Sequence, residues 1–301
     1  MSKKVLVVEG GFSAEREVSL VSGHGIADAL RTEGYDIMEH DLRDIRKFLN
    51  VLDEFKPDVV FNALHGNWGE DGEIQGVLDM LQIPYTHSGL KASAVGMDKQ
   101  ITKLICDSIG IKTPSGEKTT YKHFAQAGTQ IAMPYVIKPV CDGSSVGVHI
   151  IRSSADLTEV KFDDDAEILI EKYIEGQELT VSVLQGSALT VTEMRPREGF
   201  YDYHAKYTDG ATDHIIPAQI PQSAFDTAMR NAEKLHQALG CKTVSRCDFR
   251  YNQKDGVVLL EINTAPGMTP LSLVPEQYKY CGGSYSKLCR ILVEEASCRK
   301  M

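Results

Sequence analysis

Two apolar segments in the last third of the chain each carry a pair of polar residues separated by one position. Arg246 and Asp248 lie in the first segment, and Glu261 and Asn263 lie in the second. Side chains at positions i and i+2 share one face of a β-strand, so each pair would point to the same side of a sheet. Two carboxylates and an amide oxygen suit Mg²⁺, a hard cation that proteins usually share with substrate phosphates.

The segment 264–269 follows Asn263 directly and contains a Pro-Gly turn. Either strand alone could be a solvated face with incidental ion pairs. The turn makes that alternative less favourable, because it would bring backbone amides to the same end of the sheet as the carboxylates. We therefore expect a site for phosphates and a metal ion at this end.

Two further segments could hold a nucleotide. A predicted strand ends at Lys138 and runs into the Gly/Ser-rich loop 142–147, which can offer an ammonium, hydroxyls and N–H groups to phosphates. A G-x-x-x-x-G-K-[ST] motif is absent from the sequence, so a P-loop is excluded. The hydrophobic segment ending at 171–174 leads to Glu178. The backbone of this segment could contact adenine, and the Glu178 side chain could bind a ribose hydroxyl. A hairpin turn and an inter-domain linker are the plain alternatives for these segments.

The N-terminal part has two glycine-patterned loops. Gly10 and Gly11 precede Glu15, and the loop 65–76 contains four glycines together with His65 and acidic residues. Glu15 could bind a substrate ammonium, or it could only complement a helix dipole. The sequence has no G-x-G-x-x-G, so a dinucleotide fingerprint is not present.

The elements that must position these residues follow from hydrophobic periodicity. A strand at 5–8, a helix at 13–30 and a strand at 58–64 predict an open parallel α/β sheet whose ligands lie at the carboxyl ends of its strands. Later strands, at 135–138, 167–171, 180–184, 188–195, 245–251 and 257–263, have a hairpin-like α+β arrangement with helices at 99–109 and 223–239. We expect three segments, 1–95, 96–179 and 180–301.

Composition excludes several classes of partner. The chain has 301 residues and a formal net charge of −10, so it lacks the broad basic face that nucleic acid requires. No stretch approaches the roughly 20 apolar residues of a membrane span, which predicts a soluble protein. Seven cysteines without a C-x-x-C pair indicate neither a zinc site nor a disulfide framework. Reduced thiols of this kind are typical of a cytoplasmic protein.

Taken together, these segments resemble the D-alanine–D-alanine ligase family of the ATP-grasp superfamily. The resemblance spans nearly the whole chain in the family's order. It rests on GGFSAEREVS (10–19), ALHGNWGEDGEIQG (63–76), MDK (97–99), VIKP (136–139), DGSSVGV (142–148), EKYIEGQE (171–178), FYDYHAKY (200–207), SRCDF (245–249) and EINTAPGMT (261–269).

The resemblance implies that the chain joins two D-alanine molecules through an acyl-phosphate, with ATP as co-substrate, as a cytoplasmic homodimer. The fold implied is an N-terminal parallel-sheet domain followed by two ATP-grasp lobes. Catalytic roles fall on Glu15, Ser144, Tyr207, Arg246 and Gly267. Substrate binding falls on His65, Ser272 and Leu273. ATP binding falls on Lys99, Lys138, Ser145, Glu171, Lys172, Ile174, Glu178 and Lys206. Two Mg²⁺ (or Mn²⁺) ions would be held by Asp248, Glu261 and Asn263.

The roles that the resemblance implies are specific. Glu15 would bind the ammonium of the first D-alanine, and Arg246 with the Gly267 amide would form the oxyanion hole. The loop 201–207 would act as a lid over the site. Cys247 stands where the family more commonly has an aliphatic residue, and its side chain would face away from the metal if the strand is regular.

Three other functions remain as alternatives. A nicotinamide dehydrogenase is also α/β, but it lacks support because the dinucleotide fingerprint is missing. A non-catalytic ATP-binding module would not need the intact set of metal and oxyanion residues. A D-alanine–D-lactate ligase is the nearest rival, and Lys206 and Tyr207 favour the dipeptide-forming enzyme over it.

Overall fold

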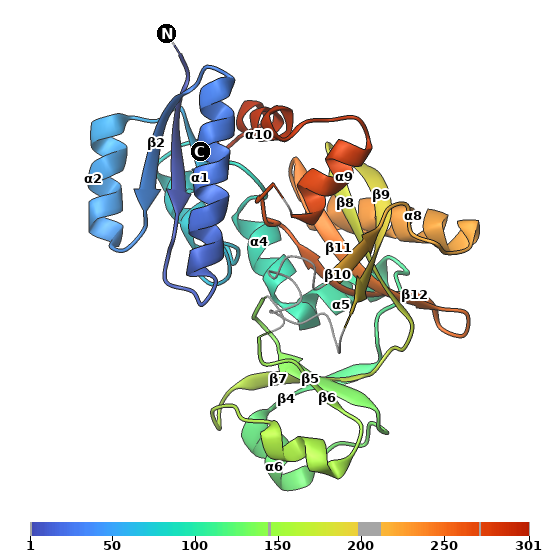
Figure 1. The fold of residues 1–301 in the computed structure, drawn as a ribbon. Helices are drawn as coiled ribbons and strands as arrows, with labels where there is room; N and C mark the ends of the chain where they lie inside the picture. Colours follow the sequence, from blue (N-terminus) through green and yellow to red (C-terminus); the bar gives the residue numbers. More distant parts are fainter. Residues whose placement is uncertain (1, 144–145, 198–211, 271, 301) are drawn as a thin grey trace.

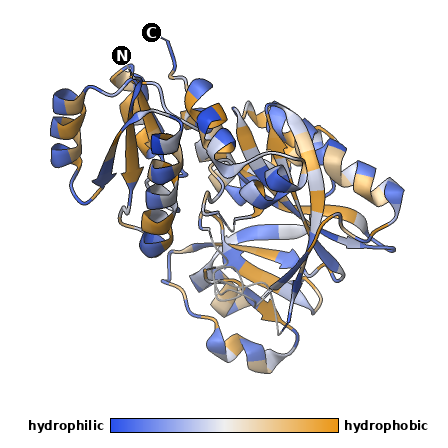
Figure 2. Cartoon of the chain, turned by 45° about the horizontal axis from the view of Figure 1, so that its top comes forward, coloured by the Kyte–Doolittle hydropathy of each residue, from blue (hydrophilic) through white to orange (hydrophobic). Residues whose placement is uncertain are grey.

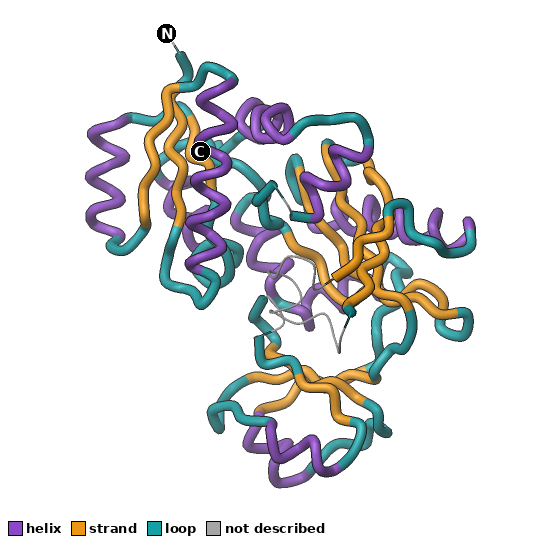
Figure 3. The backbone as a smooth tube through the Cα atoms, viewed as in Figure 1, coloured by secondary structure: helices purple, strands orange, loops and turns teal. Residues whose placement is uncertain are grey.

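The computed structural model describes residues 2–143, 146–197, 212–270 and 272–300. Its first part is a parallel sheet, as the sequence predicts, with the strand order β2-β1-β3; the edge strand β2 was not predicted. The strands are β1 (Lys4–Glu9), β2 (Asp36–Asp41) and β3 (Val59–Asn62). The helices of this part are α1 (Arg16–Thr32), α2 (Ile45–Phe55) and α3 (Glu73–Met80). Figure 3 shows helices on both sides of this sheet.

The central strand β1 is buried on both faces. Val5 and Val7 pack into one hydrophobic cluster with α1, whereas Leu6 and Val8 pack into another with α2. A strand covered by helices on both sides must be apolar throughout, which explains why the sequence shows a continuous apolar run here rather than alternation.

A small antiparallel sheet with the order β4-β7-β5-β6 forms the second part. Its strands are β4 (Gly116–Thr120), β5 (Tyr135–Pro139), β6 (His149–Ile151) and β7 (Glu167–Lys172). The helix α6 (Tyr121–Ala127) and a 3-10 helix (Ser154–Glu159) complete it. Phe124 of α6 packs with Ile137, Ile151 and Ile168 to close one face of the sheet. In Figure 1 this sheet lies below the other parts of the molecule, with its own helix beneath it.

The third part is a five-stranded antiparallel sheet with the order β10-β9-β8-β11-β12. Its strands are β8 (Gln177–Leu184), β9 (Ser187–Pro196), β10 (Thr212–Ile215), β11 (Val244–Asn252) and β12 (Gly256–Asn263). Two helices, α8 (Gln222–Leu239) and α9 (Leu273–Tyr280), pack against it. The cluster under α8 contains Leu179, Val181 and Phe249, while Gln277 of α9 donates a hydrogen bond to the Thr180 carbonyl at 3.1 Å. Figure 2 shows the hydrophobic residues concentrated in the strands.

Three helices join the parts to one another. They are α4 (Leu90–Met97), α5 (Lys99–Ser108) and α10 (Tyr285–Glu294). Cys106 of α5 packs into the core of the five-stranded sheet, and Leu288 and Leu292 of α10 pack into the core beside α1. The expected limits at 95 and 180 thus fall inside α4 and β8, and the division into three domains stays a prediction. No helix within the described ranges is long and apolar enough to cross a membrane.

Candidate active site

The polar residues of β11 and β12 lie opposite one another. The antiparallel register pairs Arg246 with Asn263 and Asp248 with Glu261. Asp248 accepts hydrogen bonds from Arg246 Nε at 3.0 Å, from Arg246 Nη2 at 2.8 Å and from Thr180 Oγ1 at 2.6 Å. These contacts hold the carboxylate in one orientation on the sheet, and they orient the guanidinium as well.

This donor set fits a divalent cation that is shared with a phosphate. Asp248, Glu261 and Asn263 offer only oxygen atoms to such an ion, as Mg²⁺ prefers. Among the described residues, no group of three or more His, Cys, Asp or Glu side chains could hold a metal ion. A cation at this position would therefore complete its coordination with the Asn263 amide and with phosphate oxygens.

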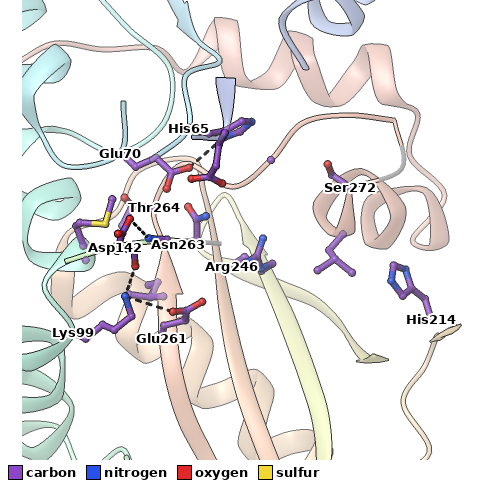
Figure 4. A pocket seen from close by; sticks show the side chains of 17 residues that line it. His65, Glu70, Lys99, Asp142, His214, Arg246, Glu261, Asn263, Thr264 and Ser272 are labelled. Carbon is purple, nitrogen blue, oxygen red and sulfur yellow. Dashed lines mark hydrogen bonds and ion pairs between the residues drawn. The ribbon is translucent and has the colours of Figure 1, made fainter. Parts of the chain in front are cut away.

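One pocket gathers residues from every part of the molecule, and Figure 4 shows its lining. Ser272 and His214 lie on one side of Arg246 in this view, whereas Lys99 and Glu261 lie on the other. The predicted site residues that line the pocket are Glu15, His65, Lys99, Arg246, Glu261, Asn263, Gly267, Ser272 and Leu273. Glu70 and Asp142, which lie in the predicted functional loops but were given no role, also line it, as does His214, which the sequence analysis missed.

The N-terminal loops bring Glu15 and His65 to this pocket. The helix begins at Arg16, later than the expected start at 13, because Ser13 is held in a turn by its hydroxyl, which donates to the His65 carbonyl at 2.6 Å. Gly66 has φ +68°, and a Cβ on it would lie 2.8 Å from Glu15 Oε2. The left-handed backbone therefore favours glycine at 66, and a side chain there would also displace the Glu15 carboxylate.

His65 is held between two buried polar groups. Its Nδ1 lies 3.2 Å from Glu70 Oε1, and its Nε2 lies 3.2 Å from the Ser22 hydroxyl. Burial raises the pKa of Glu70 above its usual range, although the hydrogen bond with His65 opposes that shift. The sequence analysis placed Glu70 in a functional loop but gave it no role, because its contact with His65 depends on the fold of that loop.

A second pocket lies between the four-stranded and five-stranded sheets. It is lined by the predicted nucleotide residues Lys99, Lys138, Glu171, Lys172, Ile174 and Glu178, and by Asp248 and Glu261. Its apolar surface comes from Val136, Val148, Ile150, Ile174 and Leu260. A cleft of this composition suits a flat aromatic base at one end and phosphates at the other.

The two pockets meet at a lysine. Lys99 Nζ donates to the Asp142 carbonyl and lies 3.9 Å from Glu261 Oε2. Burial lowers the pKa of Lys99, and the neighbouring Glu261 opposes that shift. Lys99, Asp142, Gly143 and Glu261 line both pockets, so the nucleotide cleft opens directly onto the pocket that contains Glu15.

The far side of the pocket is built on the start of α9. Ser272 is the N-cap residue of this helix, and its Oγ accepts a hydrogen bond from the Thr269 amide at 3.0 Å. A Cβ on Gly267 would lie 3.2 Å from Ser272 Oγ and 3.9 Å from His65 Cε1. Residues far apart in the sequence thus converge around the Gly267 backbone.

Comparison with known proteins agrees with this architecture. The family model for the D-ala D-ala ligase N-terminus matches residues 40–88, and the model for the D-ala D-ala ligase C-terminus matches residues 105–294. The chain belongs to the D-alanine–D-alanine ligase family.

Relatives in this ligase family cover nearly the whole chain. The D-alanine–D-alanine ligase of Gluconobacter oxydans (strain 621H) is 48% identical, over 98% of this chain and 100% of the relative. The D-alanine–D-alanine ligase of Zymomonas mobilis subsp. mobilis (strain ATCC 31821 / ZM4 / CP4) is 50% identical, over 98% of this chain and 94% of the relative.

Solved structures of similar ligases confirm the ATP-grasp fold. The D-alanine–D-alanine ligase from Bacillus anthracis complexed with ATP has a TM-score of 0.84 and 32% identity, over 98% of this chain and 97% of that one. The VanG D-Ala:D-Ser ligase from Enterococcus faecalis has a TM-score of 0.81 and 28% identity, over 98% of this chain and 99% of that one. The fold class expected from the sequence is therefore correct.

Four of the ligase-site predictions fall outside the described residues. These are Ser144, Ser145, Lys206 and Tyr207, together with the loop 201–207 that was expected to act as a lid. Their roles stay predictions from the family resemblance.

Proposed function

We propose that the protein joins two D-alanine molecules into D-alanyl-D-alanine, with ATP as co-substrate and through a D-alanyl phosphate, for peptidoglycan precursor synthesis. ADP and phosphate are the other products. The observation that carries the proposal is the junction of the two pockets at Lys99, Asp142, Gly143 and Glu261. A nucleotide phosphate and a small substrate carboxylate would meet there.

The first half-reaction needs activation of a poor electrophile. The carboxylate of the first D-alanine attacks the terminal phosphate of ATP, and Lys99 and Lys138 are placed to neutralise the charge of the transferred group. Two Mg²⁺ (or Mn²⁺) ions, held by Asp248, Glu261 and Asn263 with phosphate oxygens, would supply further charge neutralisation. Glu15, buried at the start of α1, binds the substrate ammonium and so sets which end faces the phosphate.

The second half-reaction generates an oxyanion. The free amine of the second D-alanine attacks the acyl carbon, and Arg246 together with the Gly267 N–H stabilises the charge that develops on oxygen. Each donor of this kind is typically worth about 3 kcal/mol of transition-state stabilisation. Ser272 and Leu273, at the N-terminus of α9, bind the carboxylate of the second D-alanine, where the helix dipole favours a negative charge.

The proposal includes a cytoplasmic homodimer. ATP is available inside the cell, which supports that location, and the family resemblance supports the dimer. Light scattering on the purified chain should give twice its mass of 33.2 kDa. A single-chain mass at all micromolar concentrations would refute the dimer without affecting the proposed reaction.

The decisive experiment is an assay of phosphate release and product identity. ATP and Mg²⁺ are supplied with D-alanine, L-alanine, D-serine or D-lactate, singly and in pairs. Phosphate release that requires D-alanine and yields the D-alanyl-D-alanine dipeptide is expected. No release with any of these substrates would favour the non-catalytic ATP-binding module, whereas release that does not depend on D-alanine would indicate ATP hydrolysis and would refute the ligase.

The same assay tests which second substrate is used. With equal D-alanine and D-lactate at pH 7.5, we expect dipeptide and little depsipeptide, because the sequence FYDYHAKY (200–207) resembles the dipeptide-forming ligases. Depsipeptide as the main product would instead identify a D-alanine–D-lactate ligase. The D-serine arm is included because one structural neighbour is a D-Ala:D-Ser ligase.

A further inference from the structure

A buried ion cluster lies beside the nucleotide cleft. Lys138 Nζ is 2.6 Å from Glu171 Oε2, and Lys103 Nζ contacts the other carboxylate oxygen, Glu171 Oε1. The side chains are 10%, 13% and 4% exposed for Lys138, Lys103 and Glu171. One carboxylate is thus enclosed between two ammonium groups.

The cluster is formed by elements from two different parts of the fold. Lys99 and Lys103 are four residues apart on α5, so they point from the same face of that helix. Lys138 lies on β5 and Glu171 on the adjacent β7. On the other side of β7, Gly116 leaves room for the carboxylate, because a Cβ there would lie 2.8 Å from Glu171 Cγ.

The two lysines do not have equal access to the cleft. Lys138 and Glu171 line it, whereas Lys103 is not among the described residues that do so. Lys103 Nζ instead donates to the Pro114 carbonyl at 2.6 Å, which anchors it behind Glu171. Lys103 therefore reaches a nucleotide through the two residues that it contacts and that line the cleft, the charged Glu171 and the backbone of Pro114.

The charges of the cluster favour an ionised carboxylate. Burial raises the pKa of Glu171, but Lys138 and Lys103 together lower it by more, and the net shift is downward. If Lys103 were absent, Lys138 would be the partner left to neutralise Glu171 within this cluster. Separating a buried ion pair of that kind is costly because it leaves an uncompensated charge.

We propose that Lys103 is a positioning residue for nucleotide binding. It neutralises Glu171, so that the ammonium of Lys138 can turn toward a phosphate of ATP without leaving a buried carboxylate unpaired. The inference rests on the proposed function in one respect, namely that Lys138 binds a nucleotide phosphate.

The test compares ligands with and without phosphates. In Lys103→Met, we expect the dissociation constant of ATP, measured by isothermal titration, to rise about tenfold. The dissociation constant of adenosine, measured by displacement, should change less than twofold. Lys122→Met is the matched control, because Lys122 is an exposed lysine in the part of the fold that contains Lys138 and Glu171, paired with Asp164 at 3.4 Å, and it should change neither value.

A second pair of variants separates this role from a structural one. In a Glu171→Gln background the competing carboxylate is gone, so adding Lys103→Met should leave the ratio of the ATP and adenosine affinities within twofold. Lys103→Gln, which loses the charge but keeps N–H donors near the Pro114 carbonyl, should behave like Lys103→Met and serves if the methionine variant does not fold.

The outcomes are distinct. An equal loss of affinity for ATP and adenosine, or an unchanged ATP affinity in both Lys103 variants, would overturn the inference while leaving the proposed function intact. A wild-type protein that binds adenosine and ATP equally would instead overturn the proposed contact between Lys138 and phosphate, and the inference with it.

Discussion

The parallel sheet and the five-stranded antiparallel sheet supply site residues in different ways. Glu15 and His65 lie in loops that follow β1 and β3, whereas Asp248 and Glu261 lie within paired strands. Alternation and hydrogen bonding set where a strand residue points. A loop residue depends on individual torsions, such as the positive φ of Gly66 beside Glu15. The comparison teaches that the sheet sets the positions of the residues proposed to bind metal and phosphate. Turns set the position of the residue proposed to bind the substrate ammonium.

Removing a charge from a residue on the strands should have the larger effect on catalysis. Glu261→Gln keeps the shape of the side chain and its place opposite Asp248, so the change is almost purely electrostatic. We expect kcat to fall by roughly 100-fold or more, if the metal contributes several kcal/mol to phosphoryl transfer. Steady-state kinetics measures this, with the exposed Glu54→Gln as control. A near-normal kcat would refute the assignment of Glu261 to the metal.

Removing a charge from a residue in the loops should instead weaken substrate binding. On the proposed assignment, Glu15→Gln would weaken one contact with the ammonium of the first D-alanine, a contact expected to be similar in the ground and transition states. We expect KM for the first D-alanine to rise about tenfold while kcat changes much less, since a hydrogen bond to a charged group is worth about 1.5–3 kcal/mol.

Glu17 provides a matched control for Glu15→Gln. Glu17 lies in the first turn of α1, and its side chain is 85% exposed. Glu17→Gln should leave both kinetic constants unchanged. If Glu15→Gln lowered kcat as strongly as Glu261→Gln and left KM unchanged, the division between the two sides of the site would be wrong.

The smallest expected effect concerns stability at the end of β1. Burial raises the pKa of Glu9 to about 7, with Glu39 and Asp41 adding to the shift. The folded protein therefore binds a proton that the unfolded chain releases near pH 4.5, and this contribution to stability is lost as the pH rises from about 4.5 to 7.

Glu9→Gln imitates the protonated form at every pH. We expect its Tm to exceed that of the wild type by several degrees at pH 8 and to match it near pH 4.5, because a rise of the pKa from 4.5 to about 7 corresponds to about 3 kcal/mol, and one kcal/mol shifts the Tm of chains of about 150–250 residues by about 2–4 °C and that of a longer chain by less. Thermal denaturation followed by circular dichroism measures both. An equal difference at the two pH values would show that the proton of Glu9 is not the cause.

The two sheets also differ in how far the sequence predicts them. The expected strands 245–251 and 257–263 correspond closely to β11 and β12, because alternation marks the first and the apolar run 257–260 marks the second, while the spacing of two positions defines the face that carries Asp248 and Glu261. In contrast, β4 has the polar sequence GEKTT, and it is a strand because it pairs with β7. Its own sequence carries no such signal.

Contacts across long sequence separations explain the residues that were missed. Lys103 and Glu171 are 68 positions apart, and His214 and Glu276 are 62 positions apart. No local pattern links such pairs. The roles of Gly267 and Ser272 came from the family resemblance, and the resemblance also decided between the two roles that the sequence left open for Glu15, since a loop carries little periodicity from which a direction could be predicted.

The packing of α10 against the N-terminal part also affects how the chain folds during synthesis. Leu288, Leu292 and Val293 of α10 complete the core beside α1, and Ser297 pairs with Tyr85 in the N-terminal part. A ribosome makes these residues after every other element of the N-terminal part. During translation, part of the apolar face of α1 therefore stays uncovered until α10 has emerged, so the core beneath the loop that carries Glu15 is completed late.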